Sequence, residues 1–238
     1  MTDASPRPVE VTVLVPAYNE AETIVQLLER VSEQRIEGVR FEVVVVDDGS
    51  EDETVAVVEA RPELYTRLVR LPHNQGKGGA VIVGLEVAAG DFVLFQDADL
   101  EYDPADYGRL LQPVTRFGAD IVMGSRLIAP ELTRVHYFWH KLGNRGITFL
   151  FNLLHNTTFT DIYSCYILFR RSLISPAELR SRGWGQQAEL LSLAARRANV
   201  IYEAPISYHG RTYGEGKKIR ARHVLDVIAM MLRARLGV

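Results

Sequence analysis

The strongest constraint on the fold is an alternation of short apolar runs with amphipathic segments through the first half of this 238-residue chain. Apolar runs of strand length occur at 11–15, 41–46, 67–71, 92–95 and 120–123. The segments 20–34, 53–60, 77–89 and 104–117 space their apolar residues as α-helices do. Strands that alternate with helices form a mostly parallel sheet flanked by helices. The pattern therefore predicts an α/β fold whose ligands bind beyond the carboxyl ends of the strands.

The second half of the chain is less regular. An apolar, aromatic stretch at 137–154 is followed by a strand at 166–170, a helix at 187–198 and a strand at 200–203, and a final helix begins near 223. No repeat or low-complexity linker separates this half from the first. We therefore expect a single domain over residues 1–238, with a core large enough to need no disulfides.

Composition and charge exclude several classes of protein. The net charge of −3 does not indicate a nucleic-acid-binding protein. The single cysteine, Cys165, has no partner for an internal disulfide. No apolar run approaches the roughly 20 residues of a membrane-spanning helix, and the N-terminus does not resemble a signal peptide. These features predict a cytoplasmic protein without a nucleic-acid partner, and they leave a homo-oligomer open.

The end of the chain is basic and amphipathic. From Arg211 onward it carries seven Lys or Arg residues against two acids, Glu215 and Asp226. The apolar residues of the final helix adjoin basic residues at both ends. Such a helix can lie on an anionic membrane surface, as a peripheral contact at its inner face, or pack on the domain, and the sequence leaves both open.

The sharpest chemical feature is an acidic stretch directly after the apolar run 92–95. It reads Gln96-Asp97-Ala98-Asp99-Leu100-Glu101. Alternate carboxylates at a strand end can share one hard divalent cation, which would offset charge on a departing diphosphate as a Lewis acid. The alternative is an acidic turn in which Asp99 or Asp103 caps the next helix. Mutual repulsion of three acids favours the metal, with Asp97 and Asp99 as ligands and Glu101 as a third, directly or through water.

Three other polar segments fall at the same predicted edge. In 16–20, proline stops the strand and Asn19 or Glu20 can cap the following helix. At 47–48, one aspartate would suit a nucleobase or ribose, and the other would cap a turn. The glycine-rich segment 73–80 opens a helix, so its backbone N–H groups and Lys77 could meet a phosphate, or its glycines could allow tight helix packing.

Together these motifs resemble those of family-2 glycosyltransferases, most closely the dolichyl-phosphate mannose synthase and polyprenyl-phosphate glycosyltransferase branch. The matching segments are Val-Pro-Ala-Tyr-Asn-Glu at 15–20, Val-Asp-Asp-Gly-Ser at 46–50, Asn-Gln-Gly-Lys-Gly at 74–78, Asp-Ala-Asp at 97–99 and Gly-Ser-Arg at 124–126. Their order and spacing follow the family over nearly the whole chain.

The resemblance implies a GT-A fold, an inverting mechanism, and Mg²⁺ or Mn²⁺ between the acidic stretch and a diphosphate. It assigns about 9–126 to the nucleotide sugar and about 127–238 to the acceptor, with a C-terminal amphipathic helix. The residues implied at the nucleotide sugar are Pro16, Tyr18, Glu20, Asp47, Lys77, Asp97, Ala98 and Asp99. Those implied at acceptor or phosphate groups are Arg126, His140, Asn144, Arg211 and Lys217.

The implied reaction moves mannose or glucose from a GDP or UDP sugar to a polyprenyl phosphate. A phosphate oxygen is already an anion and needs no base, whereas an alcohol acceptor would need Asp161, Glu189 or His140 to take its proton. The catalytic candidates are accordingly Asp99, Asp161, Glu189 and Arg211. The alternatives are a soluble transferase acting on a hydroxyl of a small molecule or saccharide, and a catalytically silent sugar-nucleotide-binding protein.

The segment 160–167 departs from the branch. Relatives tend to read Thr-Asp-x-Glu-Thr-Cys-Tyr-Lys, whereas this chain has Tyr163 and Ile167 in place of the second acid and the lysine. The paired loss indicates a removed ion pair or an altered acceptor pocket.

Overall fold

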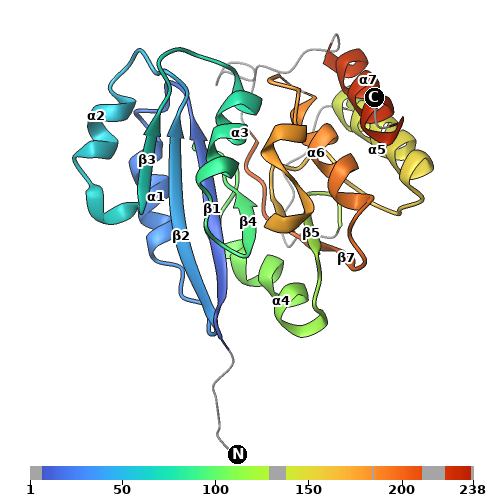
Figure 1. The fold of residues 1–238 in the computed structure, drawn as a ribbon, viewed down its shortest axis with the longest axis horizontal. Coiled ribbons are helices and arrows are strands. Elements are labelled where there is room, and N and C mark those ends of the chain that lie inside the picture. The colour runs from blue at the N-terminus through green and yellow to red at the C-terminus, as the bar shows by residue number, and fades with distance from the viewer. Residues whose placement is uncertain (1–6, 129–137, 184, 211–222, 237–238) are drawn as a thin grey trace, which may run out of the picture.

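The fold is built on one seven-stranded sheet with strand order β3-β2-β1-β4-β6-β5-β7 (Figure 1). The computed structural model describes residues 7–128, 138–183, 185–210 and 223–236. The strands are β1 (Val9–Ala17), β2 (Val39–Asp47), β3 (Arg67–Arg70), β4 (Phe92–Phe95), β5 (Ile121–Ser125), β6 (Ile167–Arg170) and β7 (Ile201–Pro205). Only β6 runs antiparallel to its neighbours, β4 and β5. The predicted α/β class with a mostly parallel sheet is confirmed.

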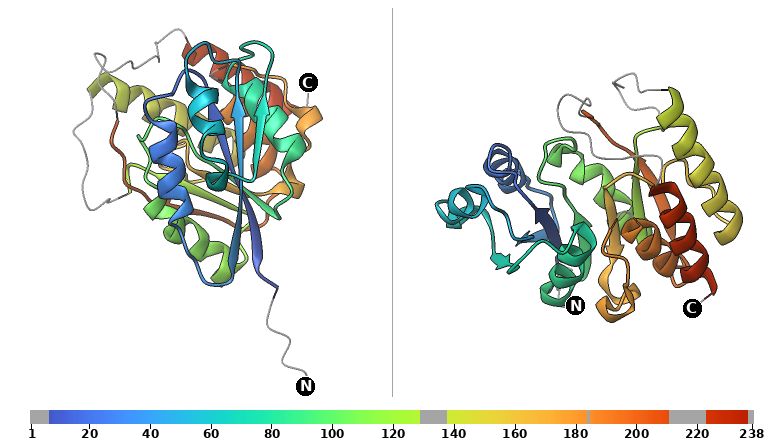
Figure 2. Two further views of the ribbon diagram at one scale, coloured as in Figure 1. Left: turned by 90° about the vertical axis from the view of Figure 1, so that its left-hand side faces the viewer. Right: turned by 90° about the horizontal axis from the view of Figure 1, so that it is seen from above.

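Helices cover both faces of this sheet and extend past one end of it. They are α1 (Ile24–Ser32), α2 (Thr54–Glu59), α3 (Lys77–Val87), α4 (Tyr107–Phe117), α5 (Phe138–His155), α6 (Gln186–Ala195) and α7 (His223–Leu236). Helices α3 and α6 lie on one face, and α1 and α4 on the other (Figure 2). Beyond the sheet, α7 packs between α6 and α5. The sheet thus joins strands from both predicted halves.

Several element boundaries differ from the prediction. The first helix begins at Ile24 rather than at residue 20, because Asn19 has a φ of 54° and the chain turns before the helix. Neither Asn19 nor Glu20 caps it, since the N-cap is Thr23. For the stretch 137–154 the sequence left the conformation open, and the structure has helix α5 at Phe138–His155.

A buried amide fixes the end of β4, where the acidic stretch begins. The side chain of Gln96 is fully buried, and its Oε1 accepts hydrogen bonds from the hydroxyls of Tyr107, at 2.9 Å, and Tyr166, at 2.6 Å. A buried polar group that keeps its partners holds its position because losing them would cost about 1–3 kcal/mol. Helix α4, through Tyr107, and the residue just before strand β6, Tyr166, therefore hold the backbone that carries Asp97.

The C-terminal helix packs on the protein. Val227 and Met231 on α7 are fully buried against the core, which is the packing alternative of the two that the sequence left open. Among the residues that the structure describes, no helix combines the length and apolar character needed to span a bilayer.

Candidate active site

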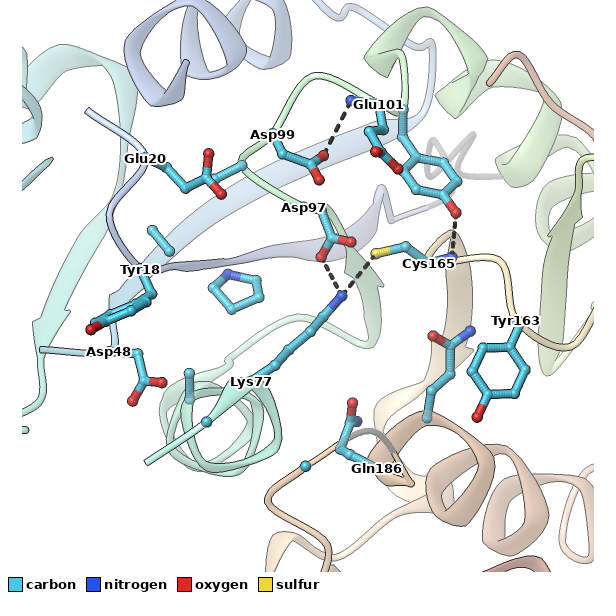
Figure 3. Close-up of a pocket in the computed structure, with 18 of the residues that line it drawn as sticks. Tyr18, Glu20, Asp48, Lys77, Asp97, Asp99, Glu101, Tyr163, Cys165 and Gln186 are labelled. Carbon is cyan, nitrogen blue, oxygen red and sulfur yellow. Dashed lines mark hydrogen bonds and ion pairs between the residues drawn. The ribbon is translucent and has the colours of Figure 1, made fainter. Parts of the chain in front are cut away.

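A cavity of about 450 Å³ opens at the carboxyl edge of the sheet. Its walls come from the loops after β1, β2 and β4, from the first turns of α3 and α6, and from segments near 163–165 and 208 (Figure 3). Strand ends and helix N-termini converge here, as expected of ligand sites on parallel sheets. The sequence placed its polar clusters at this same edge.

A lysine and an aspartate form the centre of the cavity. The side chain of Lys77 extends from the start of α3 and makes an ion pair with Asp97 (Figure 3). Burial disfavours the ammonium charge, but the carboxylates of Asp97 and Asp99 more than offset it and raise the pKa of Lys77 above its ordinary value. The Nζ atom also lies 3.6 Å from the Sγ atom of Cys165. Asp97 thus already faces a cation supplied by the chain.

The donor set around the acidic stretch suits a hard divalent cation. Asp97 and Asp99 both line the cavity with carboxylate oxygens, the ligands that Mg²⁺ and Mn²⁺ prefer. The Glu101 carboxylate also lines it and accepts a hydrogen bond from the hydroxyl of Tyr208 at 2.8 Å. Within the described ranges, no three His, Cys, Asp or Glu side chains cluster closely enough to hold a metal by themselves. A cation here would need further oxygens from a bound diphosphate.

At the other end of the cavity lie the first two strand-end loops. Pro16, Tyr18 and Glu20 line it, as the resemblance implied. Of the two aspartates at the end of β2, Asp48 lines the cavity and Asp47, the last residue of the strand, does not. Asp47 is buried, and its Oδ2 accepts the backbone N–H of Ser50, so it closes the turn. Asp48 also accepts the N–H of Gln75 at 2.7 Å, yet burial raises its pKa.

The glycine-rich segment serves tight packing. Gly76, with a φ of 83°, and Gly78 lie against the backbone of residues 181–182, and the N–H of Gly78 donates to the carbonyl of Arg182 at 3.0 Å. A Cβ atom on Gly78 would lie 2.3 Å from the carbonyl oxygen of Ser181. This close approach brings Arg182 to the cavity, where its guanidinium donates to the Gln75 side chain. The structure thus shows that the glycines allow tight packing, and the same segment also places Lys77 at the cavity.

Gly78→Ala is expected to lower the free energy of unfolding by about 1–3 kcal/mol, because the added methyl group overlaps backbone that cannot rotate away. It should also weaken nucleotide binding, since the segment at 181–182 must shift. Gly108→Ala in α4 is the matched control: its Cβ meets nothing within 4 Å, and alanine should add up to about 1 kcal/mol. Urea unfolding compares the two, and equal stability would contradict the packing role.

Arg126 lines the cavity and is held from behind by Asp161. The Nε and Nη2 atoms of Arg126 donate to the two carboxylate oxygens of Asp161 at 2.7 and 2.9 Å. Asn144 on α5 donates to the same carboxylate at 2.8 Å. The guanidinium also lies over the Tyr208 ring, 4.9 Å from its centroid. Burial alone would raise the pKa of Asp161, but Arg126 and Asn144 hold it below its ordinary value.

Glu189 lies away from this cavity. It is buried near the start of α6, where its carboxylate accepts the backbone N–H groups of Arg180 and Ser181. It borders a different cavity, of about 490 Å³, between α6 and α7. The structure therefore gives Glu189 a part in holding the 180–181 backbone and no contact with the centre around Lys77.

Three predicted residues lie outside what the structure describes. Arg211 and Lys217 fall in the segment 211–222, and for His140 only the backbone, in α5, is described. Conversely, sequence reasoning did not select Asp48, Arg182 or Gln186, all of which line the cavity. For Arg182 the one available signal was the glycine pair at 76 and 78, which marks a close approach without saying of what.

Comparisons with known proteins agree with this geometry. The family described as glycosyl transferase family 2 matches residues 12–176. A dolichol-phosphate mannosyltransferase of Pyrococcus furiosus is 29% identical over 94% of this chain and 63% of its own length, so this chain spans less than two thirds of that relative. A dolichyl-phosphate beta-glucosyltransferase of Trichomonas vaginalis is 30% identical over 94% of this chain and 72% of its own.

A solved structure supports the fold. Glucosyl-3-phosphoglycerate synthase from Mycobacterium tuberculosis, solved with Mn²⁺, UDP and glucosyl-3-phosphoglycerate, superposes with a TM-score of 0.69 at 23% identity. The match covers 97% of this chain and 81% of that one. The predicted GT-A fold is confirmed. Because the family match spans well over half of the sequence, this chain belongs to glycosyl transferase family 2 and to the polyprenyl-phosphate glycosyltransferase-like branch that its motifs predicted.

Proposed function

We propose that this protein transfers a hexose from a GDP or UDP sugar to a polyprenyl phosphate, with inversion and with Mg²⁺ or Mn²⁺. The main observation in favour of a phosphate acceptor is where the structure places the two acids that were predicted to act as a general base. Asp161 is fully buried in its bonds to Arg126 and Asn144, and Glu189 lies away from the cavity. An acceptor that arrives as an anion fits this arrangement, because it has no proton to give up.

Other side chains that line the cavity also favour a phosphate acceptor. Tyr163, which stands where relatives tend to carry an acid, lines the cavity, and burial raises the pKa of its hydroxyl. Gln186 and Gln187 line the cavity as amides, while Arg126 and Arg182 bring two guanidinium groups to it. Guanidinium groups bind phosphate oxygens through paired, charge-assisted hydrogen bonds. We assign the acceptor phosphate to the part of the cavity that Arg126 and Tyr163 line.

In this proposal the donor diphosphate lies at the Asp97 and Asp99 end. A divalent cation bound there would neutralise charge on the diphosphate as it leaves. Lys77 lies beside the same carboxylates and supplies a fixed positive charge. Pro16, Tyr18, Glu20 and Asp48 line the end for the nucleoside. The chain's task is to align two anionic partners and exclude water, and direct displacement then inverts the anomeric carbon.

The names of the relatives support a lipid phosphate as the acceptor, but they differ in the sugar that is transferred. Those from Pyrococcus and Trichomonas are named for mannose and glucose. A Methanococcus voltae relative, 27% identical over 94% of this chain and 95% of its own length, is named a UDP-N-acetylglucosamine--dolichyl-phosphate N-acetylglucosaminyltransferase. The donor panel should therefore include GDP-mannose, UDP-glucose and UDP-N-acetylglucosamine.

A thermal-shift panel tests the donor, because binding to the native state raises the melting temperature. We expect one donor to stabilise the protein with Mn²⁺ and to lose that effect with chelator. Radiolabelled donor is then supplied with a short-chain polyprenyl phosphate or with soluble alcohols. Label in the lipid supports the proposal. Turnover only with an alcohol would favour the soluble transferase, and binding without turnover on any acceptor would favour a silent sugar-nucleotide-binding protein.

A further inference from the structure

A second cavity, the α6–α7 cavity of about 490 Å³, shares no lining residue with the candidate active site. Its two helices pack side by side (Figure 1). Gly185, just before α6, lies so close to α7 that a Cβ atom there would stand 2.6 Å from Cγ of Met230. Leu193 and Met230 give the cavity an apolar wall, and the rest is strongly basic. The basic residues that line it are Arg180, Arg196, Arg197 and Arg233.

The two acids at this cavity are already committed to other partners. Glu178 accepts hydrogen bonds from both terminal nitrogens of Arg197, one of them at 2.8 Å, and this pairing lowers the pKa of Glu178 to about 2. Glu189 is buried, and its carboxylate accepts the backbone N–H groups of residues 180 and 181. Neither carboxylate therefore neutralises the other arginines.

The remaining arginines leave an excess of positive charge. In the part of the chain that the structure describes, no carboxylate lies within ion-pair distance of the Arg180 or Arg233 side chain. Arg196 donates to a carbonyl in the last turn of α7 at 2.7 Å, which leaves its charge unbalanced. Burial, with Arg235 and Arg196, lowers the pKa of nearby His155 to about 4. Guanidinium groups that converge from three segments without a free acid favour phosphate oxygens.

The backbone segment 180–182 connects the α6–α7 cavity to the active-site cavity. Arg180 lines the first, and Arg182, two residues further on, lines the second. Glu189 holds the N–H groups at the start of the segment, and the carbonyl of Arg182 accepts the N–H of Gly78 at 3.0 Å. A ligand that restrains Arg180 therefore also restrains the backbone that carries Arg182.

We propose that the α6–α7 cavity binds a small soluble phosphorylated anion, and that this ligand tightens nucleotide binding through the 180–182 segment. The phosphate would meet the guanidinium groups of Arg180 and Arg233, and the apolar wall would contact the rest of the molecule. A segment that is already restrained loses less conformational freedom when the nucleotide binds. The coupling rests on the proposed function, since it takes the active-site cavity as the donor site, whereas the anion site does not.

Calorimetry of the full chain with inorganic pyrophosphate tests the anion site. Chelator is present and nucleotide is absent, so no divalent cation can recruit the probe to the acidic stretch. We expect saturable binding that the double variant Arg180→Gln, Arg233→Gln weakens by about tenfold or more, because charge-assisted hydrogen bonds are lost.

The matched control is the double variant Arg67→Gln, Arg116→Gln, which removes the same charge from two exposed arginines that line neither cavity. It should bind pyrophosphate like the wild type, and circular dichroism on all variants checks that the fold is intact. A wild type that does not bind, an α6–α7 variant that binds as well as wild type, or an equal loss in the control would overturn the proposal.

The coupling is measured as the affinity for UDP and GDP at constant free Mg²⁺, with and without saturating pyrophosphate. We expect about fivefold tighter nucleotide binding in the wild type and no gain in the α6–α7 variant. Pyrophosphate that only competes with nucleotide, in wild type and variant alike, would overturn the coupling. Pyrophosphate binding in a protein that binds no nucleotide would support the anion site and contradict the proposed function, so the two failures are distinguishable.

Discussion

Asp99→Asn is expected to lower the rate of sugar transfer by about 10²–10³-fold, because it weakens the binding of a divalent cation, and losing one group that stabilises developing negative charge usually costs about that much. The carboxylate of Asp99 lines the cavity, and its Oδ1 also accepts the N–H of Glu101 at 3.1 Å. Asparagine keeps the size of the side chain and an oxygen for that hydrogen bond but loses the charge that a divalent cation requires. Steady-state kinetics with the donor that the thermal-shift panel selects provide the measurement.

A second readout separates metal binding from catalysis. Calorimetry of the free nucleotide with Mn²⁺ and with chelator should show a metal-dependent gain in affinity for the wild type and little or none for Asp99→Asn. Asp103→Asn is the control, because Asp103 follows shortly after the acidic stretch but caps the next turn, where it accepts the N–H of Ala105 at 3.0 Å. Asp103→Asn should keep both the rate of sugar transfer and the metal-dependent gain in nucleotide affinity. An Asp99→Asn variant with normal turnover and an intact metal effect would remove the basis of the proposed donor site.

The first half of the fold was predictable because two kinds of information coincide there. Strands β1, β2, β4 and β5 are mostly apolar and end in polar clusters, and parallel strands put such clusters at one edge. Asp97, Asp99, Lys77 and Tyr18 therefore meet in one cavity, as the sequence indicated. The same reasoning could not decide between two adjacent aspartates. Whether Asp47 or Asp48 faces the cavity depends on the residue at which β2 ends. Only the structure shows that Asp47 closes the turn and that Asp48 lines the cavity.

The second half was less predictable because its residues reach the site from distant places in the sequence. Strand β6 enters the sheet antiparallel, which no local pattern distinguishes from a parallel strand. Asp161 looked like a base because an isolated acid in a polar segment gives no hint of its partners. In the structure it is paired with Arg126, 35 residues away, and Asn144, 17 residues away. Ion pairs formed across a fold are set by packing, which composition and periodicity do not record.

That pairing leads to the largest expected effect on stability. Asp161→Asn should lower the free energy of unfolding by about 3–5 kcal/mol, because it leaves the Arg126 guanidinium, only 16% exposed, without its counter-charge. The asparagine would also turn an N–H group toward donors that now meet an oxygen. Glu59→Gln makes the same chemical change in the exposed pair with Arg70 and should cost less than about 1 kcal/mol. Urea unfolding at neutral pH measures both differences.

The dependence on pH gives this prediction a signature that a simple packing defect lacks. The pKa of Asp161 is lowered in the folded state, so its carboxylate stabilises the fold above the pKa of the unfolded chain, about 3.9. That stability is lost as the pH falls through the lower, folded value. The gap between wild type and Asp161→Asn should therefore stay constant near neutrality and narrow only below about pH 4. If the difference in unfolding free energy persisted unchanged into that acid range, the destabilisation would come from altered packing rather than from lost charge. Arg126 would then not need the Asp161 carboxylate to hold its position at the cavity wall.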